Sequence, residues 1–203
     1  MWFDIVYVAC LVNGCILYDR LLQQSGHVYP YYAIHAAFSA MIARLTAGDV
    51  FTTITDFPHL SSYPVNRDAI LWCAALHLYH ICAYWRSLTQ NDWNRHALMT
   101  YLLVPNHTLT GFALFILYGL PSSIDNALLF GVHNGWFPHM MGYRVNRWLD
   151  IWIRGPGCIA HAVLTVLASM QSEQTSWVLL PAVLTFWNYV VSESSARRVS
   201  NGE

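Results

Sequence analysis

Apolar stretches of about 20 residues recur along the whole chain, and short polar breaks separate them. A stretch of this length crosses the hydrocarbon core of a bilayer as one α-helix. The breaks hold turn-forming and charged residues, as at Gln23 to Gly26 and at Pro121 to Ser123. The pattern therefore predicts an all-α fold, a polytopic transmembrane helical bundle of about seven spans in a single domain. The spans are predicted at about residues 2–21, 29–47, 68–86, 97–118, 123–143, 152–172 and 175–195.

The composition favours a membrane environment. Hydrophobic residues make up 56% of the chain and charged residues only 10%, whereas an ordinary soluble domain has roughly 25% charged residues. A protein surface with so few charged residues would be poorly soluble in water but suits contact with lipid. The net charge of −1 provides no basic patch for nucleic acid. The chain has no lysine, which excludes a retinal Schiff base.

The arginines predict the orientation, because cytosolic loops carry an excess of basic residues. Of the ten basic residues, only Arg44 and Arg67 fall on one predicted side, and acidic residues such as Asp49 and Asp125 lean to that same side. The N-terminus is therefore predicted outside and the C-terminus in the cytosol. The arginines on the cytosolic side are Arg20, Arg86, Arg95, Arg144, Arg147, Arg154, Arg197 and Arg198.

The sequence lacks several motifs that would identify a chemistry. It has no GxSxG, no Walker loop, no HExxH and no paired HxxHH boxes. The five cysteines all fall in apolar segments without a CxxC pair, which predicts small buried hydrophobic side chains. Carboxylates occur at span ends, as at Asp4, Asp19 and Asp68, within reach of a cavity mouth. Tyrosines at span ends, among them Tyr31 and Tyr84, are predicted to be interfacial anchors.

The polar residues inside the spans are the candidate functional groups. Polar side chains at bilayer depth are costly, so they usually face a bundle interior and mark function. Histidine suits proton transfer near neutral pH and also binds metals. Histidines near the centres of five predicted spans are His35, His77, His107, His133 and His161. They are accompanied by Asn13, His80, Asn106, Thr108, Asn134 and Asn188.

Three local patterns concentrate these groups. His77 and His80 lie three residues apart, which puts both imidazoles on one helix face. Pro105 precedes Asn106, His107 and Thr108 and would kink a helix in mid-span. The segment 133–139 combines two histidines with a glycine and a proline.

These groups lead to the hypothesis of a membrane-embedded enzyme that acts on an apolar lipid or terpenoid by acid–base chemistry. Hydrolysis, isomerisation and cyclisation remain open as the reaction. The predicted catalytic residues are His77, His107 and His133, oriented by Asn106, Thr108 and Asn134. The predicted substrate-binding residues are His35, His80, His161 and Asn188.

Two other classes of function fit the same residues. No cofactor is required by the hypothesis, but histidines on neighbouring helices are also able to hold haem or zinc. In the third class the protein is a non-catalytic lipid sensor, transporter or assembly subunit, and the histidines form interhelical hydrogen bonds. The sequence does not predict an oligomeric state.

The chain from about Tyr31 to Ile153 resembles the TLC-domain family of ceramide synthases and lipid-sensing proteins. The resemblance implies a lipid-handling bundle, and by analogy a site in the endoplasmic reticulum, or in the plasma membrane if the source is bacterial. His133 and Asn134 stand where the family often has an acidic residue, and the acidic signature of ceramide synthases is absent, so N-acyl transfer is not implied. The matching residues are Ile34-His35-Ala36 with Ser39, Leu76-His77-Leu78-Tyr79, Asp92-Trp93 followed by His96, and Arg147-Trp148.

Overall fold

The computed structural model describes residues 2–56, 64–90, 93 and 108–171, and these residues form helices joined by turns. Helices α1 (Trp2–Gln24), α2 (Tyr31–Thr55) and α3 (Arg67–Tyr84) come first. Two longer helices follow, and each of them contains a π-helical segment. The first runs from α5 (Thr108–Leu114) through η2 (Phe115–Gly119) into α6 (Leu120–His133). The second runs from α7 (His139–Leu149) through η3 (Asp150–Arg154) into α8 (Gly155–Gln171).

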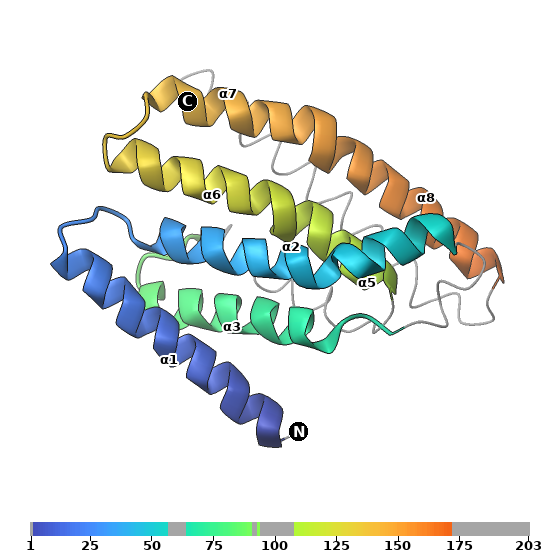
Figure 1. Ribbon diagram of the computed structural model, residues 1–203, viewed down its shortest axis with the longest axis horizontal. Coiled ribbons are helices and arrows are strands. Elements are labelled where there is room, and N and C mark those ends of the chain that lie inside the picture. The colour runs from blue at the N-terminus through green and yellow to red at the C-terminus, as the bar shows by residue number, and fades with distance from the viewer. Residues whose placement is uncertain (1, 57–63, 91–92, 94–107, 172–203) are drawn as a thin grey trace.

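The helices lie side by side in an order that differs from their order along the chain (Figure 1). Helix α3 packs between α1 and α2, and α2 packs against α5, η2 and α6 on its other side. Helices α7 and α8 cover the far side of α6 and α5. Helix α2 is therefore central among the described elements, because it contacts α1 and α3 as well as the first of the two long helices.

The all-α class is confirmed, but the number of spans differs from the prediction. Within the described residues, three helices are long and apolar enough to cross a membrane, not seven: Trp2–Gln24, Thr108–His133 and His139–Met170. Helices α2 and α3 overlap the predicted spans 29–47 and 68–86. They fall short because α2 carries Arg44 and Asp49, and α3 begins with Arg67 and Asp68. The predicted span 175–195 lies outside the described residues.

The predicted break at Pro121 to Ser123 is wrong, because the helix continues through it to His133. Proline has no N–H to donate to the carbonyl four residues earlier. Here the Ser122 hydroxyl donates to the Leu117 carbonyl at 2.7 Å and so replaces that missing hydrogen bond. The π-helical turn at Phe115–Gly119 lies just before Pro121 and loosens the backbone hydrogen bonding of the helix at that point.

The predicted span 123–143 is also wrong. Helix α6 ends at His133, and the chain turns at Gly135, whose φ of +76° suits glycine. Pro138 then precedes the first turn of α7 in an extended conformation. The turn is short and apolar residues flank it on both sides, so the average hydrophobicity of the sequence does not separate α6 from α7.

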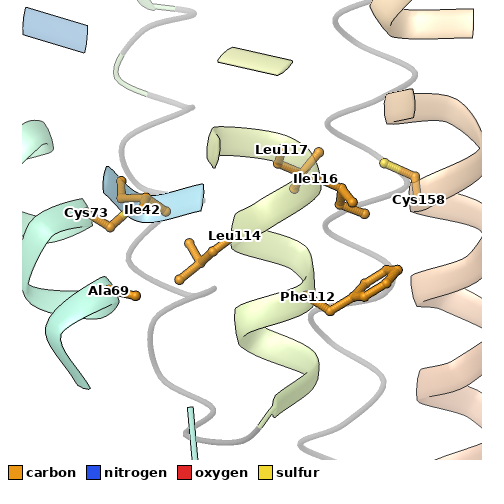
Figure 2. Packing of buried hydrophobic residues seen from close by; sticks show 8 residues of the cluster. All are labelled: Ile42, Ala69, Cys73, Phe112, Leu114, Ile116, Leu117 and Cys158. Carbon is orange, nitrogen blue, oxygen red and sulfur yellow. The ribbon is translucent and has the colours of Figure 1, made fainter. Parts of the chain in front are cut away.

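The apolar core surrounds α5 and η2 (Figure 2). Leu114 points toward Ile42 of α2 and Ala69 of α3, whereas Phe112 and Ile116 point toward α8 and Cys158. A second apolar cluster joins the first three helices and consists of Cys15, Ile34, Leu76 and Tyr79. The prediction that all cysteines are buried is wrong for Cys10 and Cys82, which are exposed.

Helices α2 and α5 approach each other closely because glycines face α2. A Cβ added to Gly111 would overlap the side chain of Asp49, and one added to Gly119 would lie 3.1 Å from the Cα of Ala43. The two helices run antiparallel, because Asp49, the later residue of α2, meets Gly111, and Ala43, the earlier one, meets Gly119. The glycines therefore set the spacing between α2 and the first long helix.

Substituting Gly111 by alanine is expected to destabilise the fold by about 1–3 kcal/mol, since the added methyl displaces the buried Asp49 side chain. Denaturant titration of the detergent-purified protein measures this change. Gly48→Ala is the matched control in the neighbouring helix. A Cβ at Gly48 meets nothing within 4 Å, so this variant should gain up to about 1 kcal/mol from helix propensity. Equal stability of the two variants would contradict the close approach at Gly111.

Asp49 also gives the protein a pH-dependent stability. It lies past the end of the predicted span 29–47, and its Oδ2 accepts a long hydrogen bond of 3.4 Å from the backbone N–H of Asn66. Burial raises the pKa of the Asp49 carboxyl to about 6. The folded state therefore holds this proton more tightly than the unfolded state does, and folding is favoured while the group stays protonated.

Stability should fall as the pH rises from about 4 to about 6, and Asp49→Asn should remove that part of the pH dependence. Unfolding titrations at a series of pH values measure the slope. Asp68→Asn, at an exposed position, removes the same charge and serves as the control. An unchanged slope in Asp49→Asn would show that this carboxyl does not couple folding to pH.

Candidate functional site

A buried carboxyl group lies where α1, α2 and α3 meet. Asp19 of α1 is only 5% exposed. Its Oδ2 accepts hydrogen bonds from the hydroxyl groups of Tyr79 at 3.0 Å and Tyr84 at 2.7 Å, both in α3. Its Oδ1 accepts a third from Gln23 Nε2 at 3.1 Å. A buried carboxyl group is stable only when its oxygens are hydrogen-bonded in this way.

Two imidazole rings contact the tyrosines that bind this carboxyl group: His35 contacts Tyr79 and His80 contacts Tyr84. His35 of α2 and His80 of α3 meet edge to face, with ring centroids 5.2 Å apart and an interplanar angle of 85°. Tyr31 stacks on His80 at 5.8 Å, and Tyr84 contacts the same ring edge-on at 5.9 Å. Both histidines are half-buried. We refer to Asp19, Tyr31, His35, Tyr79, His80 and Tyr84 as the His35–His80 cluster.

The backbone fixes the proton position on His35. Its Nδ1 lies 2.9 Å from the carbonyl oxygen of Tyr31, one helical turn earlier. A carbonyl oxygen only accepts hydrogen bonds, so Nδ1 carries the proton. In the neutral ring this leaves Nε2 as a proton acceptor, which is the form that a general base requires.

Among the predicted site residues that the structure describes, His35 and His80 come into ring contact. His77 lies on the same helix as His80, but its ring contacts Tyr118 of η2, with centroids 5.9 Å apart. His133 is exposed at the end of α6 and stacks on Tyr32 at 5.2 Å. The predicted residues Asn106, His107 and Asn188 lie outside the described residues.

Asn134 joins two loops at one end of the bundle. Its Oδ1 accepts from the Val28 N–H at 3.1 Å, and its Nδ2 donates to the Val28 carbonyl at 3.1 Å and to the Phe130 carbonyl at 2.8 Å. Oδ1 also lies 3.2 Å from Nδ1 of His27. These bonds engage both ends of the amide, so Asn134 fastens the loop after α1 to the end of α6.

His161 lies at the interface between α5 and α8, and Thr108 is buried at the start of α5. His161 is fully buried, its Nε2 lies 3.1 Å from the Leu109 carbonyl, and its ring stacks on Phe112 at 6.2 Å. Thr108 is 2% exposed at the start of α5. His161 therefore has the geometry of an interhelical hydrogen bond. This is the role that the histidines have in the non-catalytic alternative.

Four members of the cluster were not among the predicted site residues. Tyr31 and Tyr84 were predicted as interfacial anchors, Asp19 only as a carboxylate at a span end, and Tyr79 as part of the His77–His80 pattern. A signal existed, because Tyr31 precedes His35 by four residues and His80 precedes Tyr84 by four. Residues four apart share a helix face, so each pair predicts one polar, aromatic face.

A second polar cluster joins α6 to η3. The guanidinium of Arg154 donates to Asp150 and, at 2.7 Å, to Asn146, and it lies 3.7 Å from the Asp125 carboxylate. Asp125 and Arg154 had been predicted on opposite sides of the membrane, and that assignment is wrong for this pair. Because α6 and α7 form a hairpin, the two residues come to the same level of the bundle.

The haem and zinc alternatives find no ligand set in the described part of the chain. No three His, Cys, Asp or Glu side chains there are placed to hold a metal ion. The rings of His35 and His80 are in direct contact, which leaves no room between them for a macrocycle.

Comparison of the chain with protein-family models, curated proteins and solved structures finds no match. The resemblance to TLC-domain proteins therefore stays a prediction.

Replacing Tyr84 by phenylalanine should lower the free energy of unfolding by about 1–3 kcal/mol, because the buried Asp19 carboxyl loses its shortest hydrogen bond. Denaturant titration in detergent measures the loss. Tyr18→Phe is the control, since Tyr18 is 52% exposed on the same helix as Asp19. A Tyr84→Phe variant as stable as the control would mean that the hydroxyl does not stabilise the carboxyl.

Proposed function

We propose that this protein is an integral membrane enzyme that uses His35 and His80 for proton transfer on an apolar, lipid-like substrate. The observation that carries the proposal is the contact between two half-buried imidazoles, whose rings also contact the tyrosines that hydrogen-bond a buried carboxyl group. Polar groups gathered inside an apolar helical bundle are a common mark of function.

The membrane location is supported by the apolar surface of the long helices. Helix α1 has 23 residues, yet only Cys15 and Asp19 are buried. Its exposed side chains include Phe3, which is 91% exposed, and Trp2, which is 77% exposed. On α8 the exposed residues Ile159, Val163, Val166, Leu167 and Met170 form a similar surface. Lipid is the solvent that such surfaces fit.

The proposed orientation is supported by the positions of the ends of the described helices. Asn134 bonds to Val28, so the loops after α1 and α6 lie at one end of the bundle. The contact between Tyr31 and Tyr84 brings the end of α3 to the same end. Arg20 and Arg86 lie near this end, and Arg144 lies in α7, which begins there. The positive-inside rule then puts it in the cytosol and the N-terminus outside.

The cluster has the parts that acid–base catalysis requires. His35 presents Nε2 as a base, and His80, in contact with it, is the second proton carrier. The hydrogen bonds of Asp19 hold Tyr84 in place, and Tyr84 and Tyr31 each contact the His80 ring and one another. Hydrolysis, isomerisation and cyclisation of an apolar substrate each need such a pair of proton carriers.

His35→Ala and His80→Ala should each lower turnover by about 10²–10⁴-fold, the usual contribution of a positioned acid or base. The measurement is an untargeted lipid profile of cells that express the wild-type protein or a variant, compared with cells that lack it. His139→Ala, at an exposed position at the start of α7, is the control and should match the wild-type protein.

The profile is interpreted only for variants that unfold at the same denaturant concentration as the wild-type protein. If the folded double variant, His35→Ala with His80→Ala, reproduces the wild-type profile, the proposal of catalysis at this cluster is wrong. The histidines would then be packing residues of a non-catalytic membrane protein.

A further inference from the structure

Asn13 lies at the midpoint of α1 and faces away from the bundle. Its side chain is exposed, and its Nδ2 donates to the Ala9 carbonyl at 2.8 Å, one turn earlier on the same helix. Within the described residues, no hydrogen bond reaches its Oδ1. An amide at the middle of a membrane helix that faces lipid has polar atoms with no solvent to satisfy them.

The residues around Asn13 follow the spacing of a coiled-coil seam. Phe3, Val6, Cys10, Asn13 and Leu17 are separated by three, four, three and four residues, and all five are exposed. This alternation keeps one narrow stripe of a helix facing a partner helix. The buried residues Cys15 and Asp19 lie on the opposite side of α1, toward α3.

We propose that α1 pairs with α1 of a second copy of this chain, in a parallel coiled coil within the membrane, along the seam formed by these five residues. The occupant follows from charge complementarity. An amide has a partially positive N–H group and a partially negative oxygen, so it complements an identical amide across a two-fold axis. Two copies inserted in the same orientation have parallel helices, and a parallel pair brings Asn13 opposite Asn13.

The rest of the seam is compatible with this pairing. A single polar Asn among apolar seam positions fixes the register of a parallel pair. Gly14 lies next to Asn13 and has no side chain, so it adds no bulk near the seam. A Cβ added to Gly14 would meet nothing within 4 Å. Arg20 continues the spacing at the end of the helix, where its guanidinium reaches the polar membrane interface. The seam leaves the His35–His80 cluster uncovered, because Asp19 faces the other way.

Cys10 provides a direct test, because it lies on the seam and is exposed. In a Cys82→Ser background, mild oxidation of native membranes with copper–phenanthroline should give a reducible disulfide dimer of twice the chain mass. The dimer should be absent after Cys10→Ser. No dimer through Cys10, or an adduct with a protein of another mass, would overturn the pairing of two copies.

The role of Asn13 is measured by energy transfer between donor- and acceptor-labelled copies of the full chain in lipid vesicles, as the lipid-to-protein ratio is raised. Asn13→Leu should raise the dissociation constant roughly 3- to 30-fold, the range for an interhelical hydrogen-bond pair in membranes. Tyr18→Ala, on α1 outside the seam, should leave it unchanged. Undiminished association of Asn13→Leu would overturn the proposal, and neither readout depends on catalysis.

Discussion

The hydrogen bonds of the Asp19 carboxyl are the interaction on which the N-terminal half of the structure depends. A carboxyl group inside an apolar bundle is tolerated only with its oxygens paired, and its partners come from both α1 and α3. Helix α1 otherwise buries little, so it is held against the bundle by these bonds, the contact at Cys15, the ion pair of Asp4 with Arg67 and the hydrogen bond from Trp72 to Tyr7. The same bonds fix Tyr84, and Tyr84 contacts His80. One polar contact thus both anchors a helix and positions an imidazole.

The position of α2 then determines what meets at this junction. Gly111 and Gly119 let α2 lie close to α5 and η2, and its first turns run alongside the end of α3. This arrangement brings His35 toward His80, although the two residues belong to different helices. The other conspicuous histidines point elsewhere: His161 binds the Leu109 carbonyl, and His133 packs on Tyr32 at the surface.

The sequence predicted the helical class because hydrophobic length and the deficit of charge are properties of composition. It misplaced the helix ends because they depend on individual hydrogen bonds: the Ser122 hydroxyl lets the chain pass Pro121, and the turn at Gly135 ends a helix inside an apolar stretch. His35 and His80 were each found as polar residues in a span. Their meeting, and the inclusion of Asp19, required the packing of three helices, which periodicity along one helix does not contain.

The bond between Asn134 and Val28 also has a consequence for the order of assembly. Its partners are 106 residues apart, and the amide satisfies both backbone groups of Val28. A ribosome that adds about 5–20 residues per second makes Asn134 roughly 5–20 s after Val28. During that interval the backbone N–H and carbonyl of Val28 lack the partner that Asn134 provides. The loop is closed only when the α6–α7 hairpin has emerged, so completion of the C-terminal pair sets the final arrangement of the N-terminal one.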